Sequence, residues 1–239
     1  GNLHGSDDYQ LDDENANDEQ DKKAVLKEAA DNGDAESQYQ YAMLLINKFK
    51  KPQLAISYLE KASDKNHLAS LIQLGYMLRD SIGIERDLKS ARKLFLRASE
   101  QGSADAMASY GYMRFKGKGF SSPNKEEGRE YLEKSVELGS SDGLAYLGKI
   151  IEDEDPAKWE QLIKESVKLN NSNGEYFLAL LYRKYNKNLN EVESLLRSSA
   201  AKGNINSQYE ISLIENDLDM IKHQLIVGLI MLHIHMQIK

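Results

Sequence analysis

RASEQG, residues 97–102, is one of six short segments of this chain that share one shape. Each segment has Ala or Ser at its second position and ends in Gly or Asn. The six final residues are Gly33, Asn66, Gly102, Gly139, Asn170 and Gly203. Gly and Asn tolerate the left-handed backbone conformation that closes a helix at its C-terminus. The segments therefore predict six helix ends.

The six helix ends recur with a nearly constant period, since their spacings are 33, 36, 37, 31 and 33 residues. A small residue follows nine positions after each end, and apolar residues lie one before and two after it. These small residues are Ala42, Gly75, Gly111, Gly148, Ala179 and Ser212. Such a period is typical of helical repeat arrays. The sequence predicts an all-α solenoid of about five stacked helix-turn-helix pairs that winds into a right-handed superhelix.

The second helix of a repeat has start signals of its own. Asp155 followed by Pro156 is a helix-start pattern, and the pairs Asn124 with Glu127 and Asn190 with Glu193 have capping-box spacing. The loop between the two helices of a repeat varies in length, which explains the uneven period.

The basic glycine loop Lys116-Gly117-Lys118-Gly119 resembles a phosphate-binding loop but lies between two predicted helices. A Walker loop requires a preceding strand and four residues between its first Gly and a Gly-Lys-Ser/Thr sequence. We therefore interpret these glycines as a turn between helices.

Charge is unevenly distributed along the 239 residues. Eight of the 38 acidic residues lie in residues 1–21, which have no Lys or Arg, so the remaining 30 nearly balance the 31 basic residues. A balanced body argues against nucleic-acid binding. We expect residues 1–22 to be an acidic disordered tail, residues 23–217 to be the repeat array, and residues 218–239 to be an atypical apolar segment.

Composition also limits the compartment and the kind of site. There is no Cys, and the N-terminus has no apolar signal core. The apolar run Leu225–Leu232 is shorter than the roughly 20 residues of a membrane span. These features favour the cytoplasm, with the lumen of the endoplasmic reticulum left open if the chain is a fragment.

The repeat resembles the Sel-1-like repeat family, relatives of the tetratricopeptide repeats. Residues 104–139 give the family's Ala-x-Ala, its Gly-x-Gly loop at Gly117 and Gly119, and a Lys-Ser-Val-x-x-Gly end. The resemblance covers roughly residues 23 to 217. The repeats that begin near Asp34, Ser141 and Asn173 lack the Gly-x-Gly loop, and the cysteine pairs of disulfide-rich members are absent.

The resemblance implies a scaffold or adaptor that holds a protein or peptide partner, as in ubiquitin-ligase or signalling assemblies. The alternative is an accessory or regulatory domain of an enzyme, such as a kinase or a regulator of cell-wall synthesis. From the residues themselves we expect no catalytic, cofactor or metal site. Residues two apart on a helix point apart, so His233 and His235, with His223 nearby, do not form a zinc site.

Two offsets within the predicted first helices are candidates for a partner-binding groove. We expect a protein-binding surface at Gln40, Gln73, Tyr76, Tyr112, Tyr146, Lys149 and Phe177. Identical offsets in stacked repeats place Tyr76 and Tyr112 roughly 10 Å apart, as packed helices are. The alternative is that these rings only pack between adjacent first helices.

The apolar segment from Ile221 to Lys239 follows the last first helix. We expect it to fold as a helix over the face that Ile211 and Ile214 leave open, as a cap. The alternative is that the segment comes from an altered reading frame, in which case its exposed apolar side chains would promote aggregation.

Overall fold

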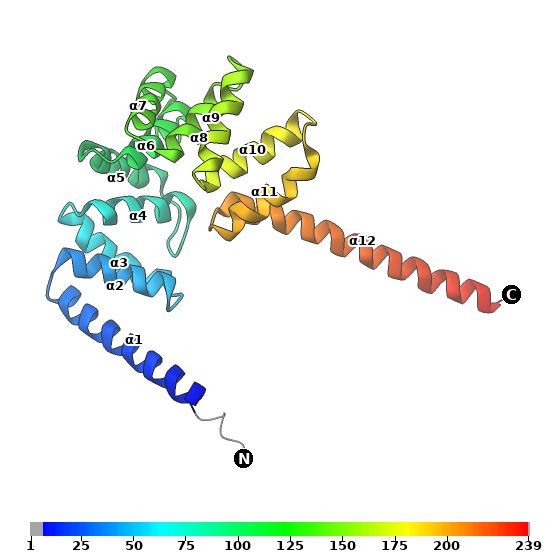
Figure 1. Ribbon diagram of the computed structural model, residues 1–239, viewed down its shortest axis with the longest axis horizontal. Coiled ribbons are helices and arrows are strands. Elements are labelled where there is room, and N and C mark those ends of the chain that lie inside the picture. The colour runs from blue at the N-terminus through cyan, green and yellow to red at the C-terminus, as the bar shows by residue number, and fades with distance from the viewer. Residues whose placement is uncertain (1–6, 239) are drawn as a thin grey trace. The chain divides into compact units, whose positions relative to one another are not determined.

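The computed structural model describes residues 7–238, with side chains from residue 16 onward. Twelve helices and no strand occur within this range (Figure 1). The first helices of the repeats are α2 (Ala35–Asn47), α4 (Leu68–Asp80), α6 (Ala104–Lys116), α8 (Ser141–Ile150), α10 (Ser172–Lys184) and α12 (Ile205–Ile238). The second helices are α3 (Pro52–Asp64), α5 (Leu88–Glu100), α7 (Lys125–Glu137), α9 (Pro156–Lys168) and α11 (Leu189–Ala201). They follow α1 (Asp7–Asp31).

The helices form two compact units, residues 1–134 and residues 135–239, and each unit is described by itself. In the first unit the core is built around Phe95, which is fully buried with side chains from α2 to α6. In the second unit Ile163, Leu181 and Leu196 are almost fully buried. Five helix pairs, α2–α3 to α10–α11, confirm the all-α helical-repeat fold.

All six predicted helix ends are confirmed. The backbone φ angle is positive at each of them, from +59° at Asn170 to +100° at Gly33. The residue after each end donates its N–H to a carbonyl five residues back, as Ser140 does to Ser135 at 2.9 Å. This bond is the Schellman motif, which satisfies carbonyl groups at the helix end.

The residue that follows each helix end also starts the next helix. Its side chain accepts a hydrogen bond from the backbone N–H three residues later, as at Ser103, where Ala106 donates at 3.2 Å. The other members of this set are Asp34, His67, Ser140, Asn171 and Asn204. Only three residues therefore separate the end of one helix from the start of the next, which restricts the angle between the two helices.

The small residues nine positions after each helix end allow close helix packing. A Cβ atom added at Gly111 would lie 2.8 Å from Cβ of Tyr131 and 2.9 Å from the carbonyl oxygen of Gly128. A Cβ atom added at Gly148 would lie 2.6 Å from Ile163. First and second helices of one repeat thus touch at these glycines.

The second-helix starts are confirmed in two cases of three. Asp155 and Asn124 accept hydrogen bonds from the N–H groups of Lys158 and Glu127. The prediction at Asn190 is wrong, because α11 begins at Leu189, directly after Asn188, which lies in the left-handed region. The loop over residues 117–119 is the predicted turn: Gly117 and Gly119 both have positive φ, and a Cβ at Gly119 would lie 2.5 Å from the carbonyl oxygen of Leu88.

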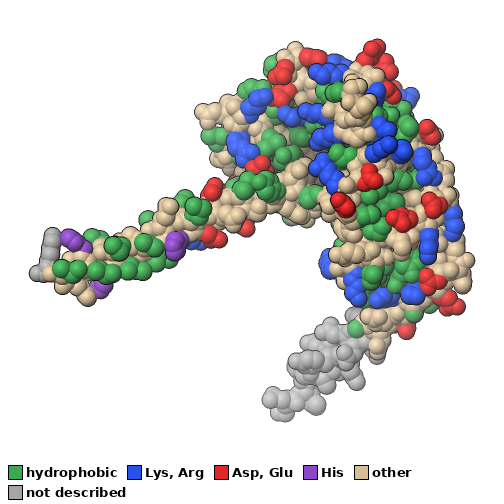
Figure 2. Space-filling view, turned by 180° about the vertical axis from the view of Figure 1, so that it is seen from behind, with side chains coloured by type: hydrophobic (Ala, Val, Ile, Leu, Met, Phe, Trp, Pro, Cys, Tyr) green, Lys and Arg blue, Asp and Glu red, His purple; other side chains and the backbone are tan. Residues whose placement is uncertain are grey.

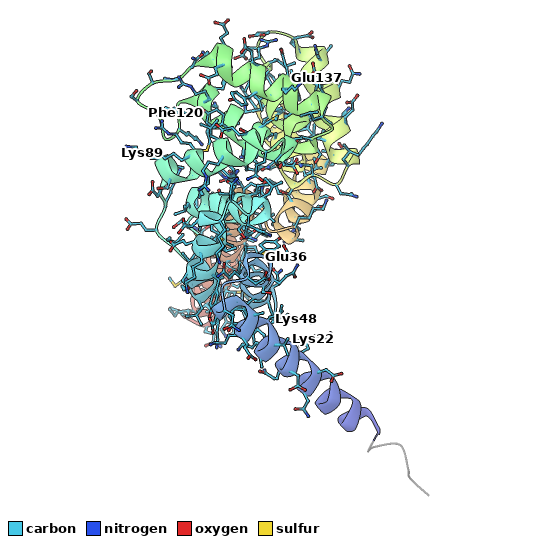
Figure 3. The ribbon with its side chains drawn as sticks, turned by 90° about the vertical axis from the view of Figure 1, so that its left-hand side faces the viewer. Lys22, Glu36, Lys48, Lys89, Phe120 and Glu137 are labelled. Carbon is cyan, nitrogen blue, oxygen red and sulfur yellow. The ribbon has the colours of Figure 1, made fainter. Side chains whose placement is uncertain are left out.

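The structure differs from the expected disorder at the N-terminus. Residues 7–22 form the first part of α1, whereas residues 1–6 lie outside the described residues. Ala30 packs in the core and anchors the C-terminal end of α1. Two side-chain contacts hold the earlier turns of this helix. Lys48 (labelled in Figure 3), directly after α2, donates to Glu19 at 2.7 Å, and the Lys23 ammonium lies 4.1 Å from the ring centre of Phe49.

The C-terminal segment is helical but does not form the expected cap. It continues α12 to Ile238 without a turn, and its side chains from Glu215 onward are exposed. Ile211 and Ile214 are only partly buried, and among residues 7–238 no helix follows α12 to cover them.

Candidate protein-binding surface

The seven predicted partner-binding residues divide between the two units. Gln40, Gln73, Tyr76 and Tyr112 belong to the first, and Tyr146, Lys149 and Phe177 to the second. Gln40 is exposed on α2 and donates to Glu36 at 2.9 Å. Gln73 is half-buried on α4, one turn before Tyr76.

Tyr76 is a half-buried ring held in a fixed position. Its centroid lies 5.4 Å from that of Phe95, which is part of the core. The Arg79 guanidinium carbon lies 5.0 Å from the ring centre of Tyr76, and Arg79 is itself oriented by two 2.8 Å bonds to Asp80. Such a ring exposes an amphipathic face at little cost in side-chain entropy.

Tyr112 has the same offset in the next first helix, α6. It is also half-buried, and the Lys116 ammonium lies 5.9 Å from its ring centre. Helices α4 and α6 both contribute side chains to the core of the first unit, among them Met77 and Met113. Gln73, Tyr76 and Tyr112 therefore lie on first helices that share one core.

A second aromatic cluster lies beside this core, in the loop that follows α6. Phe120 (Figure 3) packs edge-on against Tyr110 at 5.8 Å between centroids. The guanidinium carbons of Arg92 and Arg114 lie 4.3 Å and 4.4 Å from its ring centre. Arg114 also bonds Glu127 at 3.0 Å. This cluster ties the loop to α5 and α7, and the sequence analysis did not identify it.

In the second unit, Tyr146 and Phe177 are core residues. They are 5% and 6% exposed, and their rings meet edge-to-face at 5.9 Å. The Tyr146 hydroxyl accepts a 3.2 Å bond from Asn173. The expectation that these rings line an open groove is wrong at these two positions, because α8 and α10 pack against each other and cover them.

Lys149 belongs to a polar network that the sequence analysis missed. It donates at 3.0 Å to Glu152, whose carboxylate is buried in the turn after α8. Glu152 also accepts bonds from Lys184 at 2.8 Å and from the Tyr185 hydroxyl at 2.7 Å. Burial raises the pKa of Glu152, but these three hydrogen bonds outweigh it and lower the pKa to about 2.

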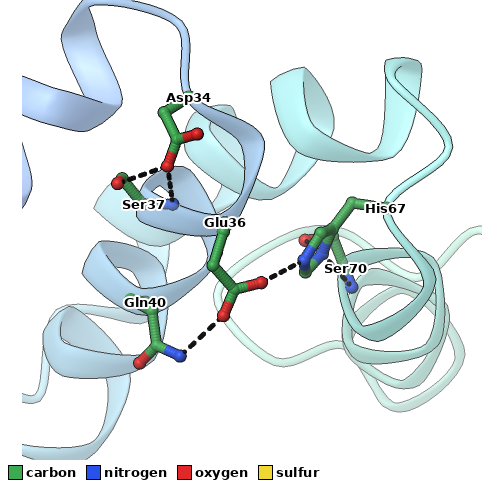
Figure 4. A network of polar contacts seen from close by, with 6 residues as sticks. All are labelled: Asp34, Glu36, Ser37, Gln40, His67 and Ser70. Carbon is green, nitrogen blue, oxygen red and sulfur yellow. Dashed lines mark hydrogen bonds and ion pairs between the residues drawn. The ribbon is translucent and has the colours of Figure 1, made fainter.

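Consecutive repeats are also joined at the starts of their first helices. In the first unit, His67 accepts the N–H of Ser70 to start α4, and its other ring nitrogen lies 2.6 Å from Glu36 (Figure 4). Hydrogen bonds, first from Gln40 and then from His67, lower the pKa of Glu36. The His67 side chain thus starts α4 and also binds α2, the first helix of the preceding repeat.

The second unit repeats this arrangement with amides. Asn171 donates to Asp142 at 2.6 Å, and Asn204 donates to Asn173 at 3.0 Å. The signal in the sequence is a polar residue directly after each helix end and, in every repeat except the one with Ala69, a second polar residue two positions later. The sequence alone does not show what this pattern does, because its effect depends on how the repeats stack.

Within the described residues, no three His, Cys, Asp or Glu side chains converge as metal ligands, and no helix is long and apolar enough to span a membrane. His233 lies on the exposed part of α12, where Nε2 is 3.0 Å from the Gln237 amide nitrogen.

Comparison with known proteins identifies the repeat. The family model described as Sel1 repeat matches residues 35–67, 68–103 and 104–140. Residues 35–140 belong to the Sel1 repeat family. These Sel1 repeats correspond to the helix pairs α2–α3, α4–α5 and α6–α7, and the structure continues with two further pairs.

Solved structures of Sel1 repeat proteins have the same fold. One, from Klebsiella pneumoniae, is 20% identical with a TM-score of 0.54, and the match covers 81% of this chain and 99% of that one. Another, from Oxalobacter formigenes, is 22% identical with a TM-score of 0.53, and covers 73% and 74%. A protective antigen of uropathogenic Escherichia coli with an SLR fold is 24% identical with a TM-score of 0.52. That match covers 82% of this chain but 44% of the antigen's length.

Proposed function

We propose that this chain is a non-catalytic scaffold that holds a peptide segment of a partner protein on the first helices α4 and α6. Sel1 repeats serve generally as protein-interaction repeats, which supports the broad class of function. The observation that carries the specific proposal is the pair Tyr76 and Tyr112, half-exposed at one offset of two consecutive Sel1 repeats.

The chemistry of this surface favours a peptide with an apolar or aromatic anchor. Tyrosine rings bury much apolar area while each hydroxyl remains able to bond, and such residues are enriched at interface hot spots. Gln73, one turn before Tyr76, supplies an amide that can pair with an extended backbone. Lys116 places a positive charge beside Tyr112, so an acidic side chain next to the anchor is favoured.

A selection from a random peptide display library tests this proposal directly. The bait is the full chain, and the affinity of an enriched peptide is then measured by fluorescence anisotropy. Tyr76→Ala with Tyr112→Ala is expected to weaken binding at least tenfold, as loss of hot-spot residues does. Leu54→Ala, at a 56% exposed residue of α3, is the matched control and is expected to leave the affinity unchanged.

Because Tyr76 packs on Phe95, the double variant needs a check on folding. Tyr76→Phe with Tyr112→Phe keeps both rings and isolates the hydroxyl groups. If the alanine variant melts normally yet binds the peptide as tightly as the natural sequence, the surface lies elsewhere and the proposal is wrong.

A further inference from the structure

Helix α12 departs from the pattern of the other first helices. The helices α2, α4, α6 and α10 each span 13 residues and end in a turn, whereas α12 runs for 34 residues. Its large apolar side chains from Leu218 onward are 44% to 80% exposed. Figure 2 shows hydrophobic side chains along this helix with histidines among them. A contiguous exposed apolar surface of this kind marks an association site.

The exposed surface continues a stripe that is covered in the other repeats. Leu74 and Met77 on α4 are 5% and 0% exposed because a second helix covers them, whereas the equivalent Ile211 and Ile214 are only partly buried. From there apolar residues recur at alternating spacings of three and four on one face of α12, while Ile226, Val227 and Ile230 make its other faces apolar as well. The stripe is Ile211, Ile214, Leu218, Ile221 and Leu225, with Leu232 in phase one heptad later.

Spacings of three and four define the a and d positions of a heptad repeat, which pack against other helices. Ile211, Leu218, Leu225 and Leu232 occupy a positions, and Ile214 and Ile221 occupy d positions. Gly228 and His235 occupy the two remaining d positions. The stripe therefore fits a helical partner in coiled-coil geometry.

Charges beside the stripe identify the partner and its direction. Asp217 is at a g position and Lys222 is at the e position of the next heptad. Glu215, at the e position before them, is paired with Arg197 of its own chain at 3.4 Å. In a parallel, in-register coiled coil Asp217 and Lys222 meet between chains, and the pair forms at every interface of a symmetric assembly. An antiparallel arrangement with full overlap leaves both charges without an opposite partner. A second copy of this chain supplies the complementary charge.

We propose that residues 211–235 associate with the same segment of other copies of this chain as a parallel coiled coil of three or four helices. Leu218 at a with Ile221 at d, and Ile211 and Ile214 at both positions of the preceding heptad, shift the preference from two strands to three or four. The apolar residues Leu229, Met231 and Met236 lie at e and g positions, which larger bundles cover more fully. This inference is independent of the peptide surface on α4 and α6.

The mass of the full chain in solution, measured by light scattering at tens of micromolar, tests this proposal. We expect three or four chain masses for the natural sequence and one chain mass for Ile221→Lys with Leu225→Lys. The matched control, Ile226→Lys with Ile230→Lys, changes residues of similar exposure, 56% and 53%, off the stripe and is expected to stay associated. Circular dichroism confirms that both variants remain helical.

A charge exchange tests the parallel register. Asp217→Lys alone is expected to weaken association at least tenfold, and adding Lys222→Asp is expected to restore it. A single chain mass for the natural sequence overturns the proposal. Equal dissociation of stripe and control variants also overturns it, as does binding of single chains to phosphatidylcholine vesicles in place of self-association.

Discussion

At the scale of single residues, glycines determine how closely the helices of one repeat approach. Gly111 and Gly148 lie where an added Cβ would meet the partner helix at 2.6–2.9 Å. Contacts this short force the backbone or the neighbouring side chain to move. Gly228 of α12 has nothing within 4 Å of an added Cβ within its own chain. At its d position in the proposed coiled coil, a larger apolar side chain would add packing between chains, so neither setting predicts a loss of stability.

Replacing Gly111 or Gly148 with Leu is expected to overpack the helix contact. The expected loss of stability is on the order of 1–3 kcal/mol, because a well-packed core accommodates extra volume poorly. Thermal unfolding followed by circular dichroism measures it. Gly228→Leu is the control and is expected not to lower the melting temperature, since Leu also favours helix over Gly. Equal melting temperatures for all four proteins would show that these glycines are not close-packed.

The buried carboxylate of Glu152 makes stability depend on pH. Its pKa in the folded chain is about 2, below the ordinary value of 4.5. A lowered folded pKa stabilises the fold above pH 4.5, and this contribution is lost as the pH falls toward 2. The full contribution is at most about 3 kcal/mol, from the size of the pKa shift.

Glu152→Gln removes this titration while keeping the side-chain shape. Above pH 5 the variant is expected to be less stable, and the difference from the natural sequence is expected to shrink between pH 4.5 and pH 2. Urea unfolding at several pH values measures this. A constant difference in stability over that range would mean that Glu152 titrates normally in the folded chain.

At the scale of helices, the junction between repeats combines a helix end with a helix start. Asn171 accepts the N–H of Gly174 at 3.0 Å and donates to Asp142 in the preceding repeat. Loss of such a cap costs about 1 kcal/mol, and loss of the bond between repeats adds to it.

Asn171→Ala is therefore expected to lower stability by about 1–2 kcal/mol. Asn190→Ala is the matched control, because Asn190 is the exposed second residue of α11 and its side chain does not start the helix. It is expected to be neutral or slightly stabilising, since Ala favours the helix interior. If Asn190→Ala proves the more damaging change in chemical unfolding, the assigned start of α11 is wrong.

The sequence predicted helix ends better than it predicted surfaces. Helix ends depend on local backbone conformation, so Gly and Asn at the ends of the six segments identified them all. Whether Tyr146 and Phe177 are buried or exposed depends on how α8 packs against α10. The residue type at one position of the repeat does not determine that packing. The same limit applies to Glu152, whose partners Lys184 and Tyr185 are 32 and 33 residues away. The C-terminal segment does not cover Ile211 and Ile214 as expected. Apolar residues predict that a face will be buried, but they do not identify the helix that buries it.

At the scale of the whole chain, the repeated unit explains how the helices are stabilised. Within each unit, each helix pair buries its apolar stripe against its neighbours, so stability arises from contacts between adjacent repeats. The two compact units each present surfaces of their own, and Gln73, Tyr76 and Tyr112 all belong to the first. The right-handed winding of the array, the division of the chain at residues 22 and 217, and the partner's identity stay predictions.

The central claim is that a partner peptide binds on the first helices α4 and α6. Photo-crosslinking of a selected peptide to benzoylphenylalanine placed at position 73 or at position 54 tests it most directly. We predict a crosslink from position 73, beside Tyr76, and none from position 54 on α3. A peptide that crosslinks from position 54 and not from position 73 would contradict the claim.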